Sequence, residues 1–404
     1  MSFQQALSGL NAASRSLDVI GNNIANAGTT GMKSSRAEFS EIYASSVGAI
    51  GGTNVGLGVD VGAVSQQFSQ GTLSITGNDL DVAVNGSGFF QVQAPDGTKQ
   101  YTRAGNFKLD KSGNIITNTG AALMGYPTDA KGVRQSFDMQ GLRLPTGAPI
   151  PARQTTKMAA EVTLDSSAVV ASSATPPTPL QTYGTSLTAF DAQGLEIPVG
   201  LYFTKTANNS WEVRTSVNGS DPAASAPIPI NFMADGSLDP ATPMPTLTLA
   251  SPNDPAQTFP VTLDLSNMTQ VNARFAVSDL TQDGYTAGQL TGLKIEDSGI
   301  LTATYSNGQT QAAGQIALVN FRNAQGLAPV GSGNWVETAS SGQPVRGAPG
   351  EGTFGQLRAG ALEESNVDLT AELVNMMTTQ RAYQANAQTI KTQDQVMQTL
   401  VNMR

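Results

Sequence analysis

Both ends of the 404-residue chain carry the same spacing of apolar side chains, which constrains the fold more than any other feature. Near the N-terminus, steps of three and four residues alternate through Phe3, Ala6, Leu10, Ala13, Leu17, Ile20, Ile24 and Ala27. Near the C-terminus the same alternation, interrupted by the polar Gln380 and Asp394, runs through Leu369, Leu373, Met376, Tyr383, Ala387, Ile390, Met397 and Val401. A sustained repeat of about 3.5 residues is typical of a coiled coil. We therefore predict two terminal helices, each with an apolar seam of the coiled-coil type.

Residues beside the two repeats predict where these helices begin and end. The first helix is expected to stop within residues 26–31, where Gly28 can take the left-handed conformation that ends many helices. Ser365 or Asn366, with Asp368 just inside, is expected to cap the start of the second helix. The outer faces of both helices carry mainly Ser, Asn, Gln, Thr and Ala and few charges. Such faces can pack against further helices, so we expect neighbouring subunits to cover them.

The chain between the helices is patterned for β structure. Short alternating runs at 80–84 and 89–92 end at turns that contain Asn-Gly or Asp-Gly, which is typical of hairpins. Residues 71–144 and 285–358 share this pattern. Residues 145–284 hold 16 of the 21 prolines, and twelve acidic against five basic residues. We interpret them as an inserted all-β domain whose acidity favours solubility.

Together these patterns predict a mainly β fold with α-helical termini, in which each domain is nested inside the next. Because the two chain ends meet, the terminal helices are expected to pair as an antiparallel coiled coil. The predicted ranges are 1–28 and 365–404 for the terminal helical domain, 29–70 and 359–364 for a connecting segment with extended or β structure, 71–144 and 285–358 for the inner β domain, and 145–284 for the outer β domain.

Composition excludes most enzyme chemistry. The chain has no histidine and no cysteine, which excludes Ser-His-Asp hydrolysis, thiol nucleophiles, disulfides and the usual zinc sites. No pattern places two carboxylates across a cleft, and we interpret the pair Glu363 and Glu364 as favourable to the dipole of the second helix. Residues 56–62 lack the spacing of a dinucleotide loop, and 110–114 lack the later ligands of a calcium loop. We therefore expect no enzyme activity, no cofactor and no metal ion.

Charge and hydropathy limit the possible partners. The net charge of −9, from 22 basic and 31 acidic residues, argues against a general nucleic-acid-binding protein. No apolar run approaches the roughly 18 residues that cross a bilayer, so we expect no membrane insertion. Residues 1–5 have neither the basic nor the apolar region of a cleaved signal peptide. The protein is therefore expected to be cytosolic, or exported by a route that does not require such a signal.

Three segments resemble motifs of the flagellar rod and hook axial protein family. They are residues 10–33, 101–114 and 362–386, and they follow the order of the family. The positions that carry the resemblance are Asn22, Asn23, Asn26, Gly31, Lys33, Arg103, Gly105, Phe107, Asn366, Val367, Arg381 and Tyr383. Met32 departs from the family, which often has an aromatic residue before this lysine.

Within that family, the insertion at 145–284 resembles the hook proteins more than the rod proteins. The resemblance implies a subunit that self-assembles into a curved helical tube around an export channel and transmits motor torque as a universal joint. It also implies an extracellular place in the hook of the flagellar basal body and type III export without a cleaved signal. The implied partners are further copies of the chain, the distal rod protein, the hook cap protein and the hook–filament junction protein.

Two alternatives remain open at this stage. A distal rod subunit would share the helices and the motifs, although a straight rod does not need the insertion. A surface adhesin-like β protein would explain the Ser/Thr-rich insertion but not the repeats at both ends of the chain.

Overall fold

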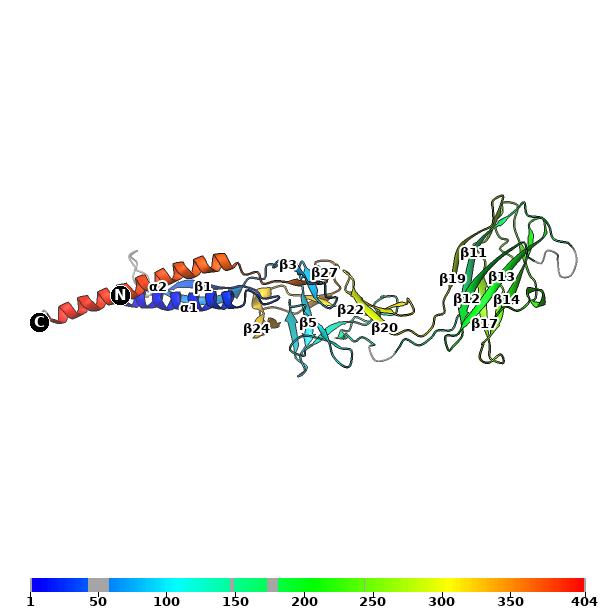
Figure 1. Cartoon of the computed structure of the whole chain (residues 1–404). Coiled ribbons are helices and arrows are strands. Elements are labelled where there is room, and N and C mark those ends of the chain that lie inside the picture. The colour runs from blue at the N-terminus through cyan, green and yellow to red at the C-terminus, as the bar shows by residue number, and fades with distance from the viewer. Residues whose placement is uncertain (1, 43–57, 146–148, 173–180, 243, 403–404) are drawn as a thin grey trace. The chain divides into compact units, whose positions relative to one another are not determined.

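The computed structural model describes residues 2–42, 58–145, 149–172, 181–242 and 244–402. The chain divides into two compact units (Figure 1). The first unit comprises residues 1–147, 292–304 and 310–404, and the second comprises 148–291 and 305–309. The predicted fold class, mainly β with a helix at each end, is confirmed.

Two long helices begin and end the described chain and pack side by side (Figure 1). They are α1 (Ser2–Ala25) and α2 (Leu369–Asn402). Gly9 lies against Asn386, and a Cβ atom on Gly9 would be only 2.8 Å from Asn386 Nδ2, so glycine allows this close approach. At the other end of α1, Asn23 Nδ2 donates to Glu372 Oε1 at 2.9 Å. The helices are therefore antiparallel, as predicted, whereas coiled-coil pairing stays a prediction.

Helix α1 ends directly before the predicted segment 26–31, but the left-handed residue is a different glycine. The helix stops at Ala25, and Gly28 does not have a positive φ angle. Gly31 instead has the left-handed conformation, with φ of 69°. The predicted role of Gly28 is therefore wrong, because the chain makes a short turn before it needs a left-handed residue.

The start of α2 also differs from the prediction. The carboxylate of Asp368 accepts hydrogen bonds from the backbone N–H groups of Thr370 at 2.9 Å and Ala371 at 3.1 Å. Asp368 is therefore the N-cap, because its side chain binds two of the free N–H groups in the first turn. The predicted caps, Ser365 and Asn366, are wrong.

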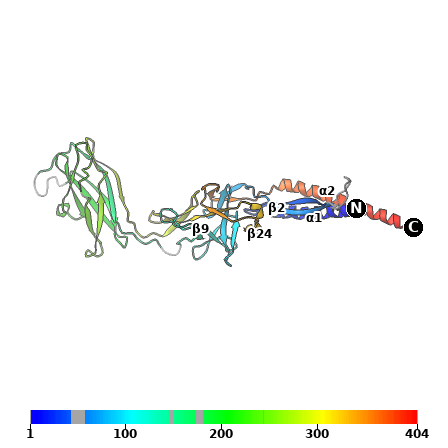
Figure 2. The ribbon, with the colours of Figure 1, turned by 180° about the vertical axis from the view of Figure 1, so that it is seen from behind.

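An antiparallel hairpin packs against α1. Its strands are β1 (Ser35–Ile42) and β2 (Gly58–Gln66). β2 lies beside α1 (Figure 2), and the backbone N–H of Val59 donates to Ser8 Oγ at 3.3 Å. Both strands fall inside the predicted connecting segment 29–70, of which 43–57 lie outside the described residues.

The rest of the first unit is β structure. Its strands before the second unit are β3 (Leu73–Ile75), β4 (Val82–Asn85), β5 (Phe89–Gln93), β6 (Lys99–Thr102), β7 (Lys108–Leu109), β8 (Ile115–Ile116), β9 (Ala122–Tyr126) and β10 (Gln140–Gly141). Those that follow are β20 (Leu290–Ile295), β21 (Ile300–Tyr305), β22 (Thr310–Ile316), β23 (Leu318–Asn320), β24 (Ala328–Gly331), β25 (Asn334–Val336), β26 (Val345–Gly347), β27 (Gln356–Ala359) and β28 (Ala361–Glu363), with the short 3-10 turn η2 (Ala324–Gly326).

Strands from before and after the second unit pair with one another. The large sheet follows the order β20-β21-β22-β9-β5-β6-β25-β24, while β27 pairs with β4 and β28 with β3. The two halves also share one core, in which Phe90 and Leu123 pack in the same cluster as Leu301 and Ile316. The runs predicted at 80–84 and 89–92 correspond to β4 and β5, and the hairpin predicted at the Asp-Gly turn is formed by β5 and β6. The hairpin predicted at the Asn-Gly turn is wrong, because β4 pairs with β27 and not with β5.

The second unit is a separate all-β unit with its own core. One sheet has the order β12 (Tyr183–Phe190), β13 (Glu196–Ala207), β14 (Ser210–Val217), β15 (Ile228–Asn231). The other has the order β16 (Thr246–Ala250), β17 (Thr258–Asp264), β11 (Lys157–Asp165), β18 (Thr269–Val271), with β19 (Ala276–Gln282) paired to β11. A 3-10 turn, η1 (Pro222–Ala224), follows β14.

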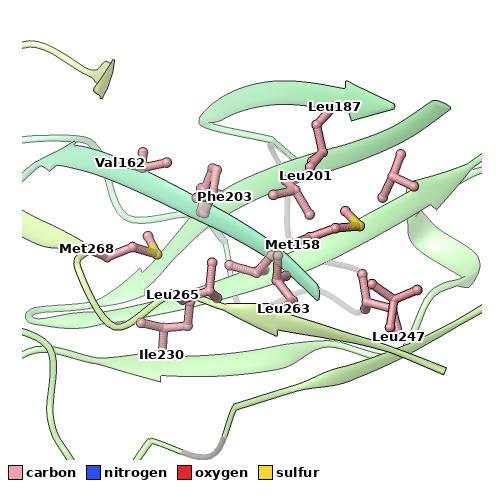
Figure 3. Close-up of a cluster of buried hydrophobic side chains, with 14 of the residues drawn as sticks. Met158, Val162, Leu187, Leu201, Phe203, Ile230, Leu247, Leu263, Leu265 and Met268 are labelled. Atoms are coloured by element: carbon pink, nitrogen blue, oxygen red, sulfur yellow. The ribbon is translucent and has the colours of Figure 1, made fainter. Parts of the chain in front are cut away.

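Alternate side chains of these strands face inward, as the period of a strand requires. Figure 3 shows Met158 of β11 and Phe203 of β13 in one cluster, and both are fully buried. This core is formed entirely by residues of the second unit.

Candidate functional site: a buried ionic joint and an exposed helix

One fully buried carboxylate binds two basic side chains in the first unit. Glu363 ends β28, and its Oε1 accepts a hydrogen bond from Lys33 Nζ at 2.6 Å. Its Oε2 accepts from Arg103 Nη1 at 3.1 Å, and the backbone N–H of Gly71 also donates to Oε1, at 3.0 Å. The side chains of Lys33 and Glu363 have no solvent exposure, and that of Arg103 is 6% exposed. We call Lys33, Arg103 and Glu363 the ionic joint.

Each cation of the ionic joint also binds the backbone of another segment. Lys33 Nζ donates to the carbonyl oxygen of Ser69 at 2.8 Å. Arg103 Nη2 donates to the carbonyl oxygen of Gly86 at 2.9 Å. The Arg103 guanidinium also lies 5.2 Å from the centre of the Phe89 ring, within the range of a cation–π contact. The joint therefore holds together segments that are far apart in the sequence.

The charges of the ionic joint do not balance. Two cations share one carboxylate, and within the described residues neither Lys33 nor Arg103 makes an ion pair with another acidic group. Burial lowers the pKa of Lys33, and the nearby Arg103 charge lowers it further, against the opposing effect of Glu363. Burial likewise lowers the pKa of Arg103. Burial therefore disfavours the charged forms of both basic side chains, which share one carboxylate.

A tight turn brings Lys33 into the joint. Gly31 has a φ of 69°, and its N–H donates to the carbonyl oxygen of Glu363 at 2.8 Å. A Cβ atom on Gly31 would lie 2.5 Å from the backbone nitrogen of Ala104 and 2.6 Å from the carbonyl carbon of Arg103. Glycine is required here both for its backbone conformation and for this close approach.

Two asparagines extend the network from the joint toward the helices. Asn366 Oδ1 accepts from the backbone N–H of Ser34 at 2.7 Å, and its Nδ2 donates to the carbonyl of Gln67 at 2.7 Å. Asn23 of α1 is 1% exposed. It accepts from the backbone N–H of Ser35 at 2.9 Å and donates to the carbonyl of the same residue at 2.8 Å. Side-chain amides thus connect α1, the hairpin and the segment that precedes α2.

Family models and full-length relatives match along the chain. The models are described as Flagella basal body rod protein (residues 3–33), Flagellar hook protein FlgE/F/G D1 domain (83–170), Flagellar basal body protein FlaE D2 domain (163–285) and Flagellar basal body rod FlgEFG protein C-terminal (358–403). The Flagellar hook protein FlgE of Escherichia coli (strain K12) is 43% identical over 419 residues, which cover 100% of both chains. That of Treponema pallidum (strain Nichols) is 32% identical and covers 100% of this chain and 99% of its own.

The chain belongs to the flagellar hook protein family. This confirms the resemblance seen in the three sequence motifs, and it favours a hook subunit over a distal rod subunit or an adhesin. A solved structure, the crystal structure of Helicobacter pylori flagellar hook protein FlgE2, shares the fold with a TM-score of 0.55 and 15% identity. It covers 72% of this chain and 100% of its own.

Two further motif residues of this hook-family chain lie in the β part of the first unit. Gly105 accepts from the backbone N–H of Val82 at 3.0 Å, and a Cβ atom on it would lie 1.6 Å from the carbonyl oxygen of Val82. Phe107 is 2% exposed and packs edge-on against Phe90, with ring centres 5.2 Å apart. Both residues hold the packing beside β4 and β5.

The remaining motif residues do not reach the ionic joint. Asn26 Nδ2 donates to Asn22 Oδ1 at 2.6 Å at the end of α1. Val367 is half-buried before α2, whereas Arg381 and Tyr383 lie on α2 and are exposed. In a single chain, the last two are therefore available to other molecules.

The predicted seam of α1 is largely covered within the chain. Ala6, Ala13 and Ile20 are buried, Leu10, Leu17, Ile24 and Ala27 are half-buried, and Phe3 is exposed. The predicted seam of α2 is less covered: Met376, Ala387 and Ile390 are half-buried, while Leu369, Leu373, Tyr383, Met397 and Val401 are exposed by 37–72%.

Some polar side chains of α2 contact α1, while large apolar side chains of the same helix are exposed. Glu372 and Asn386, which contact α1, are both polar. The exposed apolar set of α2 comprises Leu369, Leu373, Val374, Met377, Val396, Met397 and Val401. These side chains are spread from the first turn of α2 to its last.

The sequence predicts Glu363 near the start of the second helix, and this prediction is wrong. It does not lie at the start of a helix, because α2 begins only at Leu369. Glu364 is exposed and follows the strand, so the interpretation of the pair as favourable to the helix dipole is wrong. Lys33, Arg103 and Glu363 each lie in one of the three motifs, but the motifs contain other charged residues as well, so the sequence did not single out these three.

The described residues contain no group of three or more acidic side chains arranged to hold a metal ion. At 110–114, Asp110 Oδ1 accepts from the backbone N–H groups of Ser112 at 2.8 Å and Asn114 at 2.7 Å, so its carboxylate holds a turn of the chain. Of the helices in the described part of the chain, none is both long and apolar enough to span a membrane.

Proposed function

We propose that the chain is a structural, non-enzymatic subunit that polymerises into the curved helical tube of the flagellar hook. In this tube it would surround the export channel and transmit torque from rod to filament as a universal joint. The observation that carries the proposal is the full-length similarity to flagellar hook proteins. The exposed apolar set of α2 supports it, because these side chains need partners outside the single chain.

Each predicted domain range is assigned to one layer of the proposed tube. Residues 1–28 and 365–404 form the inner tube, with the seams of α1 and α2 as its contacts and their polar, nearly uncharged faces toward the channel. Residues 29–70 and 359–364 connect this tube to the inner β domain, and residues 145–284 form the outermost layer. Bending requires subunit spacing to change on every turn, so the outer contacts are weak and polar while the inner helices pack tightly.

The partners follow from this position in the flagellum. The chain binds further copies of itself along the tube, the distal rod protein at one end, and the hook cap protein and then the hook–filament junction protein at the other. It leaves the cell through the flagellar type III export apparatus without a cleaved signal peptide, and it acts outside the cell in motility. It binds no cofactor and no nucleic acid.

Replacing Leu373 by aspartate tests the role of the exposed apolar set. Leu373 is 50% exposed, so the change is expected to alter the free energy of unfolding of the single chain by no more than about 0.5 kcal/mol. In the tube the new carboxylate would be buried without a partner, which costs several kcal/mol at each subunit. We expect no tubes from the Leu373→Asp chain, as judged by electron microscopy, with β units that unfold at the wild-type temperature.

Leu373→Met is the matched control, because it keeps an apolar side chain of similar volume, and it is expected to form normal tubes. Leu17→Asp tests the seam of α1 in the same assay and is also expected to prevent assembly. Normal tubes from either aspartate variant would contradict the role of the terminal helices.

A further inference from the structure

The second basic residue of the ionic joint, Lys33, is not required to balance the charge of Glu363, so the stability of the folded chain does not explain its presence. Without Lys33, Arg103 and Glu363 would remain as a neutral pair, and Gly71 would still donate to the carboxylate. Removing one partner of a buried ion pair is costly because it leaves an uncompensated charge, and the loss of Lys33 would leave none. The lowered pKa of Lys33 agrees, since it shows that the folded chain disfavours the charged ammonium.

The contacts of Lys33 differ from those of Arg103 in what they connect. Arg103 directly follows β6 and binds Gly86 and Glu363, so all of its polar contacts stay within the β part of the first unit. Lys33 lies between α1 and β1, and it binds Ser69 and Glu363. Lys33 is therefore the member of the joint that connects the chain segment carrying α1 to the β part.

We propose that Lys33 is a positioning residue that fixes the rotation and register of α1 and its hairpin on the β part of the first unit. Its two directional bonds, at 2.6 Å and 2.8 Å, define one arrangement, whereas apolar burial is non-directional. The inference rests on the proposed function, because a tube that transmits rotation needs its inner helices attached at the same angle in every subunit.

Lys33→Met and Arg103→Met form a matched pair of tests. Each variant removes one cation and leaves one balanced ion pair with Glu363, but only Lys33→Met removes bonds to the segment that carries α1. Each full-length chain would be produced in the bacterium that lacks its own copy, and its hooks would be examined by electron cryo-microscopy. The unfolding temperature of each isolated chain would be measured in parallel.

We expect Lys33→Met to unfold within about 3 °C of the wild type, a shift that corresponds to about 1 kcal/mol. Its hooks are expected to have an altered subunit twist, with α1 rotated relative to the β part, whereas Arg103→Met hooks keep the wild-type twist. Wild-type twist in Lys33→Met hooks would overturn the proposal. A loss of more than about 10 °C in both Lys33→Met and Lys33→Gln would also overturn it, because Lys33 would then serve stability.

The failure of this inference is distinguishable from failure of the proposed function. If the wild-type chain itself formed no tube in the same assay, the proposed function would be contradicted, together with the positioning role that rests on it. If wild-type and Lys33→Met chains formed tubes of identical twist, only the positioning role would be contradicted.

Discussion

Removing the charge of Glu363 is expected to destabilise the first unit strongly. In Glu363→Gln, a neutral amide would face the Lys33 ammonium and the Arg103 guanidinium, and neither cation has another acidic partner within the described residues. Breaking one buried ion pair by removing one partner costs about 3–5 kcal/mol. Here two cations lose the same partner, so this range is a lower estimate. For a unit of this size it corresponds to a fall of about 6–20 °C in unfolding temperature.

Differential scanning calorimetry of the full chain measures this effect. The second unit has its own core, so its transition is expected to stay in place and serves as an internal reference. Glu364→Gln is the matched control, because it makes the same chemical change at the exposed neighbouring residue, and it is expected to shift stability by no more than about 0.5 kcal/mol. Equal shifts below about 2 °C for both variants would refute the view that Glu363 holds two buried cations.

Two further predictions concern the same region. Gly31→Ala is expected to lower the free energy of unfolding by about 1–3 kcal/mol, because the left-handed backbone and the backbone nitrogen 2.5 Å from the added Cβ both oppose alanine. Gly28→Ala is the control, since a Cβ atom there meets nothing within 4 Å. Equal unfolding temperatures for the two variants would contradict this prediction. Raising the pH is expected to increase the stability of the wild type relative to Lys33→Met. The pKa of Lys33 is lowered by burial, so between that value and about 10.4 the unfolded chain binds more protons than the folded chain, and stability rises with pH. Thermal unfolding of both chains from neutral pH to about pH 10 measures the difference, and a decrease would show that the folded state favours the charged lysine.

Much of the fold could be predicted because it depends on local patterns. The alternation of three and four residues through Leu10 and Leu17 defines α1, and Asn-Gly and Asp-Gly turns mark the ends of β4 and β5. Periodicity shows which side chains are apolar, but not which molecule covers them. Leu373 therefore belongs to the predicted seam and yet is half exposed in the single chain, while the polar Asn386 contacts α1.

The ionic joint could not be predicted from local patterns. Lys33 and Glu363 are 330 residues apart, and no spacing rule connects a turn after a helix to the end of a short strand. The contacts of Asn366 could not be predicted either, because an asparagine just before a helix usually caps that helix. It instead binds Ser34 and Gln67, which only the folded chain brings near. Such long-range polar contacts follow from topology, which the sequence specifies collectively.

The measurement that tests the central claim most directly is deletion of the gene in its native bacterium, followed by electron microscopy of purified motor structures. Basal bodies with a finished rod and no curved hook are the expected result. Truncated rods would show that the chain is a rod subunit, and intact flagella would contradict a place in the flagellum altogether.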